Sequence, residues 1–258
     1  MNDKIKIIFV DIDWTLFDHN ILKYHQSGLD ALEKARRNGV KVIICSARCY
    51  SSFTHVKALD VIPHDGYICS CGGIAYAEGE YVYRQRIEPE LAKTFIDRAS
   101  SLNYELQIIG PTYSFLTMPE NDLATEYYKF WYEYHPSVKA YEGEEVTSIV
   151  LFCRGNEEDQ FRDLPLHFYR FYDSGVDVTQ APYIKSTGIK AILNYYGFSK
   201  EDAMAIGDDI ADIEMFNEVG TSIAMGNGKD EAKAVATYVT DNIDSDGLEK
   251  GLKYFNII

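Results

Sequence analysis

The sequence lacks any apolar run long enough to cross a membrane, and it does not begin with a basic segment followed by a long apolar stretch. Positive charge is also scarce, since 25 Lys and Arg face 40 Asp and Glu, for a formal net charge of −15. A surface this acidic repels nucleic acid and anionic membranes. We therefore expect a soluble cytoplasmic protein that binds neither.

Cysteine is infrequent and shows no zinc-finger spacing. The chain has five cysteines, an odd number: Cys45, Cys49, Cys69, Cys71 and Cys153. Cys69 and Cys71 could hold a metal with distant partners, but reduced and buried thiols are the more common outcome. The six histidines likewise show no metal-site spacing, so none of them is assigned a role.

Both ends of the chain show the pattern of an α/β core. The 258 residues, 46% of them hydrophobic, are enough for one large domain or for a core with an insertion. Strands are predicted at residues 5–10, 40–45, 66–69, 203–207 and 221–225, and helices at residues 28–35, 56–59, 188–196 and 213–219. This alternation favours a Rossmann-like core built on a parallel sheet.

The middle of the chain is different. Aromatic residues crowd residues 127–134, and strand-like pieces alternate with helical ones, at residues 81–83, 90–100, 147–152 and 167–171. The aromatic rings could stack on a sugar, but filling the core of a small domain is the more common use. We predict an inserted α+β domain at residues 81–179 and a core made of residues 1–80 and 180–258.

Polar side chains suited to phosphate chemistry follow the predicted core strands: Asp11, Asp13, Ser46, Asp208 and Asp212, with Lys185 just before a C-terminal helix. Each could by itself be a helix cap, a loop residue or a surface residue. In an open α/β sheet, however, ligands bind just beyond the carboxyl ends of the strands. Carboxylates that meet there need a compensating charge, which is usually a metal.

With these residues the chain resembles the haloacid dehalogenase (HAD) superfamily of phosphohydrolases, and within it the Cof-like sugar phosphatases with a large α/β (type IIB) cap. The resemblance rests on Asp-x-Asp-x-Thr at residues 11–15 and Gly-Asp-x-x-x-Asp at residues 207–212, and it covers nearly the whole chain. It implies a Mg²⁺-dependent phosphomonoester hydrolase that acts on a small phosphorylated metabolite, with a sugar phosphate as the family expectation, through an aspartyl-phosphate.

The resemblance also implies roles for single residues. Asp11 would be the nucleophile, and Asp13 would protonate the leaving alcohol and then activate water. Asp11, the backbone carbonyl of Asp13, and Asp208 would bind Mg²⁺. Asp212 could bind the metal directly or through water, or could orient Lys185, whose ammonium would contact both the phosphate and the nucleophile.

The segment after the second predicted strand is expected to bind the phosphate oxygens. The family's usual Thr-Gly-Arg is Ser46-Ala47-Arg48 here. Ser46 would supply its hydroxyl, and the backbone around Ala47 would supply N–H groups. Arg48 could contact the phosphate or pair with a carboxylate.

Three departures from the family pattern suggest lower activity or an altered substrate fit. Trp14 stands where family members usually have Gly, beside the nucleophile. Cys71 replaces an Asn after the third strand, and Ala211 replaces an Asn in the second motif. Asn227 also matches a family position, although it could simply belong to a turn between two glycines.

Two other functions stay open at this point. A phosphomutase would use the same Asp pair but would return the phosphoryl group to its substrate. A non-catalytic, metal-binding HAD-like module is favoured by Trp14 and Ala211, whereas the retention of the motif carboxylates and Lys185 favours an enzyme. In the enzyme, the cap would shield the intermediate and read the leaving group. The chain is expected to be a monomer or a weak homodimer.

Overall fold

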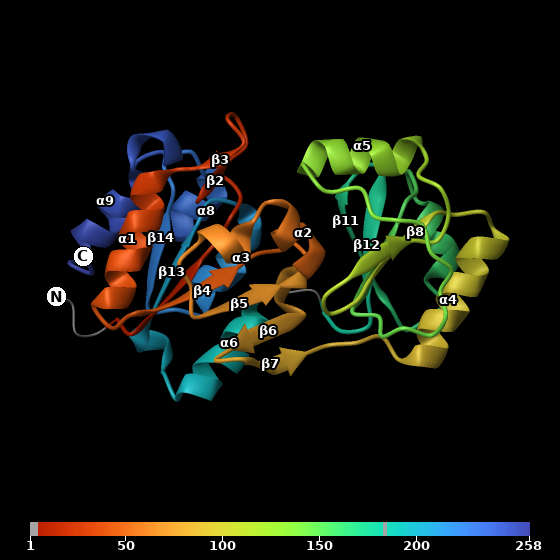
Figure 1. Cartoon of the computed structure of the whole chain (residues 1–258), viewed down its shortest axis with the longest axis horizontal. Helices are drawn as coiled ribbons and strands as arrows, with labels where there is room; N and C mark the ends of the chain where they lie inside the picture. Colours follow the sequence, from red (N-terminus) through yellow and green to blue (C-terminus); the bar gives the residue numbers. More distant parts are fainter. Residues whose placement is uncertain (1–4, 183–184) are drawn as a thin grey trace. The chain divides into compact units, whose positions relative to one another are not determined.

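The computed structural model describes residues 5–182 and 185–258 (Figure 1). Its contacts divide the chain into two compact units. The first unit comprises residues 1–48, 57–83 and 184–258, and the second comprises residues 49–56 and 84–183. The sequence-based boundaries at residues 81 and 179 stay a prediction. Residues 1–4 and 183–184, which fall within the predicted core ranges, lie outside the described residues.

An eight-stranded sheet forms the centre of the first unit, in the order β15-β14-β13-β1-β4-β5-β6-β7. The strands are β1 (Ile7–Val10), β4 (Lys41–Cys45), β5 (Gly66–Cys69), β6 (Ile74–Ala77), β7 (Glu80–Arg84), β13 (Ala203–Gly207), β14 (Thr221–Ala224) and β15 (Tyr238–Val239). Neighbours from β15 to β5 pair in parallel, and β6 pairs with β5 in antiparallel fashion. The predicted α/β core is therefore confirmed.

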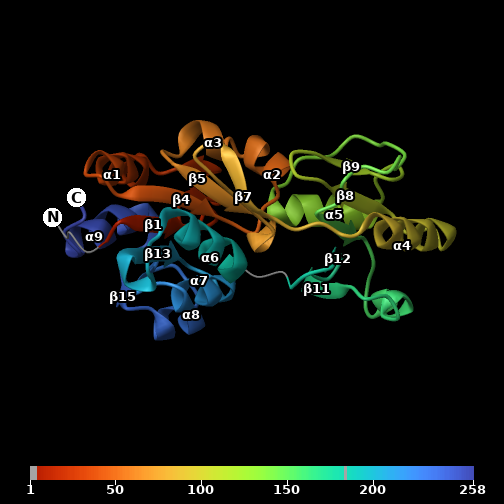
Figure 2. The ribbon, with the colours of Figure 1, turned by 90° about the horizontal axis from the view of Figure 1, so that it is seen from below.

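Helices cover this sheet on both sides, which explains why β1 is apolar at every position and β4 at every position after Lys41. The helices are α1 (Gln26–Arg37), α3 (Ala58–Val61), α6 (Lys185–Tyr196), α7 (Ile213–Asn217), α8 (Asp230–Val235) and α9 (Gly247–Tyr254). Side chains of α6, α7 and α8 form one buried cluster with Ile7, Phe9 and Ile43 of the sheet. Helix α1 lies on the opposite side (Figure 2). Both faces of β1 and β4 are thus removed from water.

One predicted helix is wrong. The helix expected through residues 56–59 is broken at Lys57, whose φ of 55° is left-handed, so α2 (Tyr50–His55) ends before it and α3 begins after it. A short ribbon follows the first strand of the core, formed by β2 (Phe17–Asp18) and β3 (Lys23–Tyr24).

The second unit is an α+β structure around a five-stranded antiparallel sheet, in the order β11-β12-β10-β8-β9. Its elements are α4 (Pro89–Ser101), β8 (Leu106–Ile109), β9 (Ser114–Leu116), α5 (Asp122–Trp131), β10 (Ser148–Leu151), β11 (His167–Tyr172) and β12 (Gly175–Thr179). The alternation of β8 and β10 places Ile108 and Ile149 in the cluster with α4, and Ile109 and Val150 in the cluster with α5.

The aromatic residues of α5 divide between core and surface. Tyr128 is buried, as expected for a side chain that fills the core, whereas Phe130 and Trp131 are exposed. The expectation that the crowded aromatics serve the core is therefore wrong for these two. The reason is the amphipathic periodicity of α5, which turns only one face toward the sheet. Within residues 5–182 and 185–258, no helix has the length and apolar character needed to cross a membrane.

Candidate active site

The first carboxylates of the site lie together because two parallel strands end side by side. Strands β1 and β13 pair with Val10 opposite Ile206, and the Asp11 N–H donates to the Ile206 carbonyl at 3.0 Å. Asp11 follows β1 and Asp208 follows β13, so both side chains emerge at the carboxyl edge of the sheet. One carboxylate oxygen each from Asp11, Asp208 and Asp212 lie within 4.8 Å of one another, and all three residues are buried.

Lys185 joins this carboxylate cluster from the first position of α6. Its Nζ lies 2.7 Å from Asp11 Oδ1 and 2.6 Å from Asp212 Oδ1, and the residue is only 3% exposed. Burial alone would lower the pKa of Lys185, but Asp11 and Asp212 outweigh it and hold the pKa well above its usual value. The side chain is therefore an ammonium ion shared between two carboxylates.

Asp212 uses both of its oxygens. Oδ1 accepts from Lys185, while Oδ2 accepts from the backbone N–H groups of Asp208 at 2.8 Å and Asp209 at 3.0 Å. These contacts close the 3₁₀ turn Ile210–Asp212 over the end of β13. They also require Gly207, because a Cβ there would lie 2.4 Å from Asp212 Oδ2. Asp212 thus orients Lys185, one of the alternatives that the sequence left open; its role as a direct metal ligand stays a prediction.

The cluster would carry a net negative charge if all of its carboxyl groups were ionised, and this makes their ionisation unfavourable. Three carboxylates face one ammonium, and burial, with help from the neighbouring acids, raises the pKa of Asp11 well above its usual value and that of Asp208 to about 8. Thr15 donates its hydroxyl to one oxygen of Asp208, Oδ1, at 3.2 Å. Buried carboxylate oxygens with excess negative charge suit a hard divalent cation. The residues present therefore fit a divalent metal.

Asp13 lies in a second group with Arg48 and His19. Arg48 forms a two-pronged contact, from Nε to Oδ2 at 2.9 Å and from Nη2 to Oδ1 at 2.8 Å, and His19 Nε2 donates to Oδ1 at 2.6 Å. Burial would raise the pKa of Asp13, but Arg48 and His19 outweigh it and hold the pKa well below its usual range. The structure thus shows Arg48 paired with a carboxylate, while phosphate binding by Arg48 stays a prediction.

Trp14 adopts a backbone conformation that favours glycine. Its φ is 57°, in the left-handed region, at the turn where the N–H groups of Thr15, Leu16 and Phe17 all point to the Ile12 carbonyl. The family's usual Gly would take this conformation without strain. Asn227 holds the turn from outside, since its Nδ2 donates to the Trp14 carbonyl at 2.8 Å.

The remaining predicted residues lie around these groups. Ser46 is buried and its Oγ accepts from the Arg48 N–H at 3.2 Å, so it shapes the turn that presents Arg48. Ala47 is exposed, and Ala211 is exposed within the 3₁₀ turn. Cys71, after β5, is buried in a left-handed conformation. Phosphate binding by Ser46 and Ala47 stays a prediction.

Sequence reasoning missed His19. Its six-residue separation from Asp13 carries no metal-site signal, and only the turn into β2 brings the imidazole back to the carboxylate. For Asn227 the sequence left open a family position or a turn, and the structure shows that its side chain connects two segments: besides its contact with Trp14, its Oδ1 accepts from the Ile243 N–H at 2.8 Å. The signal that could have found both was the unusual Trp14 itself.

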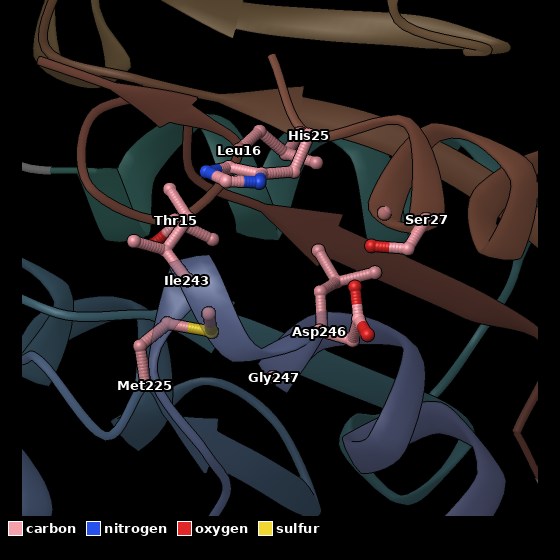
Figure 3. A pocket seen from close by; sticks show the side chains of 10 residues that line it. Thr15, Leu16, His25, Ser27, Met225, Ile243, Asp246 and Gly247 are labelled. Atoms are coloured by element: carbon pink, nitrogen blue, oxygen red, sulfur yellow. The ribbon is translucent and has the colours of Figure 1, made fainter. Parts of the chain in front are cut away.

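A small cavity lies behind the Asp-x-Asp turn. Figure 3 shows Thr15 and Leu16 on one side of it and Met225, Ile243 and Asp246 on the other. Its volume of about 10 Å³ is enough for roughly one water molecule. None of the cluster carboxylates lines it, so this cavity cannot admit a phosphorylated metabolite to the site.

Comparison with known proteins identifies a family and several relatives of this chain. A family model described as haloacid dehalogenase-like hydrolase matches residues 8–252. YkrA of Bacillus subtilis (strain 168), provisionally named a phosphatase, is 26% identical over 256 residues, which cover 98% of each chain. A hypothetical protein of Geobacillus kaustophilus HTA426 has a solved structure with a TM-score of 0.90 at 30% identity, covering 98% of this chain and 100% of the other. The structure of the HAD subclass IIB sugar phosphatase BT4131 matches with a TM-score of 0.79 at 28% identity, over 98% of this chain and 100% of that one.

Proposed function

This chain belongs to the haloacid dehalogenase-like hydrolases, and we propose that it hydrolyses small phosphomonoesters, sugar phosphates foremost, through a phosphorylated Asp11. The observation that carries the proposal is the buried contact of Lys185 with Asp11 at 2.7 Å inside a cluster of three carboxylates. The names of relatives support it, since YkrA is provisionally named a phosphatase and BT4131 is a subclass IIB sugar phosphatase.

We propose Mg²⁺ as the metal, held by Asp11, Asp208 and the backbone carbonyl of Asp13. When bound, it supplies positive charge between the attacking carboxylate and the phosphate. Asp212 positions the site residues, because its two carboxylate oxygens hold Lys185 and the turn after β13 in place. Lys185 holds the nucleophile in a fixed position and offers its remaining N–H donor capacity to a phosphate oxygen.

Asp11 attacks the phosphorus in the first half of the proposed reaction, and the bond between phosphorus and the ester oxygen breaks. Asp13 gives a proton to that oxygen, so the alcohol leaves neutral. In the second half, Asp13 takes a proton from water, whose oxygen attacks the same phosphorus and releases inorganic phosphate and free Asp11. Arg48 and His19 lower the pKa of Asp13 and so favour the ionised form that the second half needs, whereas the first half requires that Asp13 binds a proton before the alcohol leaves.

The two alternatives lead to different measurements. A phosphomutase would interconvert phosphosugars without releasing phosphate, and a non-catalytic module would bind metal without turnover. Phosphate release from a panel of sugar phosphates, with Mg²⁺ and then with EDTA, separates them. We expect release that depends on Mg²⁺ and is lost in Asp11→Asn, whose side chain keeps its shape but cannot attack. Asp60→Asn, the same change at an exposed position, serves as the control.

We further propose that the second unit acts as the cap and contains the residues that read the leaving group, residues 81–179 by the sequence boundaries. We also propose a cytoplasmic enzyme, monomeric or weakly dimeric. The cytoplasmic location is supported by the odd number of cysteines, five, and by the absence of zinc-finger spacing among them. Light scattering at increasing protein concentration tests the oligomeric state. Tetramers or larger assemblies would contradict it.

A further inference from the structure

Trp14 combines a left-handed backbone with a large exposed side chain. Its backbone is in the left-handed region, φ 57°, where a bulky residue is strained by about 1–2 kcal/mol relative to glycine. Its large apolar side chain is also 37% exposed. Leu22 shows the same combination, with a φ of 52° and 46% exposure, so strain and exposure alone assign no use to the ring. What distinguishes Trp14 is its position directly after Asp13 and the contact of its ring with His19.

His19 connects the Trp14 ring to the reacting end of the site. Its imidazole donates to Asp13 at 2.6 Å, and its centroid lies 5.2 Å from that of the Trp14 ring, with an interplanar angle of 31°. Phe17 holds the imidazole from another side, edge-on, at 5.1 Å. The indole is thus fixed one side chain away from the carboxylate that is expected to protonate the leaving oxygen.

The backbone of Trp14 is fixed as well. Its N–H donates to the Phe17 carbonyl at 2.9 Å, and its own carbonyl accepts from Asn227 at 2.8 Å. Asn227 is in turn held by the Ile243 N–H. With both ends of the peptide held and the imidazole beside the ring, the indole has little conformational freedom to lose when a ligand packs against it.

We infer that the exposed indole of Trp14 is a platform for the leaving group, and that the preferred substrates are phosphomonoesters of alcohols whose ring presents a flat apolar face. This inference rests on the proposed function, because it takes Asp13 as the group next to the leaving oxygen. The rest of the alcohol must extend away from Asp13. The Trp14 indole lies next to this path and favours an alcohol whose ring can stack on it. A short acyclic alcohol has no such face.

Binding of two phosphonates that cannot be hydrolysed tests the platform directly. Benzylphosphonate carries a ring one atom from phosphorus, and ethylphosphonate does not, so titration calorimetry of each in the presence of Mg²⁺ isolates the contribution of the ring. Trp14→Gly removes the platform and places the better-suited residue at the left-handed position, so this variant is expected to fold. Trp14→Phe keeps an aromatic face.

Trp14→Gly should weaken benzylphosphonate binding about tenfold and ethylphosphonate binding by less than about twofold. Trp14→Phe should retain most of the preference for benzylphosphonate. An equal loss for both ligands would overturn the inference, since Trp14 would then act on Asp13 or on the turn. No change for either ligand, or no benzylphosphonate binding by the parent, would overturn it as well.

A separate measurement distinguishes failure of the proposed hydrolysis from failure of the inference about Trp14. Phosphate release from phenyl phosphate and from glycerol 2-phosphate is followed with the same three proteins. Absence of turnover in the parent, together with a Trp14-dependent preference among the phosphonates, would contradict hydrolysis and leave the platform intact. Turnover with the same ratio of kcat/KM values for the two esters in parent and Trp14→Gly would contradict the platform alone.

Discussion

Asp212 and Lys185 form a buried contact of 2.6 Å in which each side chain has a second task. Lys185 also contacts Asp11, and the other oxygen of Asp212 binds two backbone N–H groups at the end of β13. The position of the proposed nucleophile is therefore linked, through one ammonium and one carboxylate, to the turn that presents Asp208. Removing either partner should disturb the whole cluster.

Asp212→Asn should be destabilising and nearly inactive. An amide has one acceptor oxygen, so either its NH₂ group faces the Lys185 ammonium or it faces the two backbone N–H donors. We expect a loss of about 2–4 kcal/mol in the free energy of unfolding and at least about a tenfold fall in kcat. Urea unfolding and phosphate release measure the two effects. A variant as stable and active as Asp60→Asn would show that the contact is dispensable.

Divalent metal should stabilise the folded chain. Three carboxylates face one ammonium in the cluster, so a cation that binds only the native state raises its stability by mass action. Millimolar Mg²⁺ should raise the melting temperature of the parent by several degrees, about 2–8 °C. Asp208→Asn should reduce this increase because it removes a ligand and excess charge together. An equal increase in both proteins would mean that the metal binds elsewhere.

Arg48→Met distinguishes the two roles considered for Arg48. The guanidinium lowers the pKa of Asp13 in the structure, so its loss should raise that pKa. Because Asp13 must be protonated to act as the general acid, the alkaline limb of the kcat/KM–pH profile should move to higher pH. A residue that mainly binds phosphate would instead leave the limb in place and weaken inhibition by inorganic phosphate. The pH profile and the inhibition constant, measured on parent and variant, decide between these outcomes.

Glu105 should make the stability of the second unit depend on pH. The residue is fully buried, one oxygen accepts from the Asn121 N–H at 2.9 Å, and the other has no partner among the described residues. Burial raises its pKa to about 7. The folded state holds the Glu105 proton more tightly than the unfolded state does. Proton binding by Glu105 therefore adds to the free energy of unfolding below about pH 4.5, and this stabilisation is lost as the pH rises through 7.

Glu105→Gln removes this titration while preserving an acceptor for Asn121. The free energy of unfolding of the variant, relative to that of the parent, should be about 1–3 kcal/mol higher at pH 8 than at pH 5. Urea unfolding at both pH values measures the difference, with exposed Glu90→Gln in α4 of the same unit as the control. A parent and variant with parallel pH dependences would show that Glu105 does not titrate in this range.

The core and its family could be predicted because they rest on local patterns. Apolar runs such as residues 203–207 are typical of buried strands, and parallel strands bring their carboxyl ends to one edge, so Asp11 and Asp208 were expected at the same edge of the sheet. That their strands are neighbours is seen only in the structure. The motifs at residues 11–15 and 207–212 then indicated the HAD family, which the match over residues 8–252 confirms.

The details that could not be predicted depend on single dihedral angles and on side-chain geometry. No pattern in residues 56–59 signals the left-handed Lys57 that separates α2 from α3. The contact of His19 with Asp13 depends on how tightly the chain turns before β2. Whether Asp212 would face the metal or Lys185 depends on the backbone of the 3₁₀ turn, which the sequence alone does not specify.

The central claim is that Asp11 carries the phosphoryl group. Rapid acid quenching during turnover of a good sugar phosphate, followed by mass spectrometry of peptides, tests it most directly. The account predicts one added phosphoryl group on the peptide that contains Asp11, and neither this adduct nor phosphate release in Asp11→Asn. Turnover that continues in Asp11→Asn, or a phosphoryl group on another residue, would contradict it.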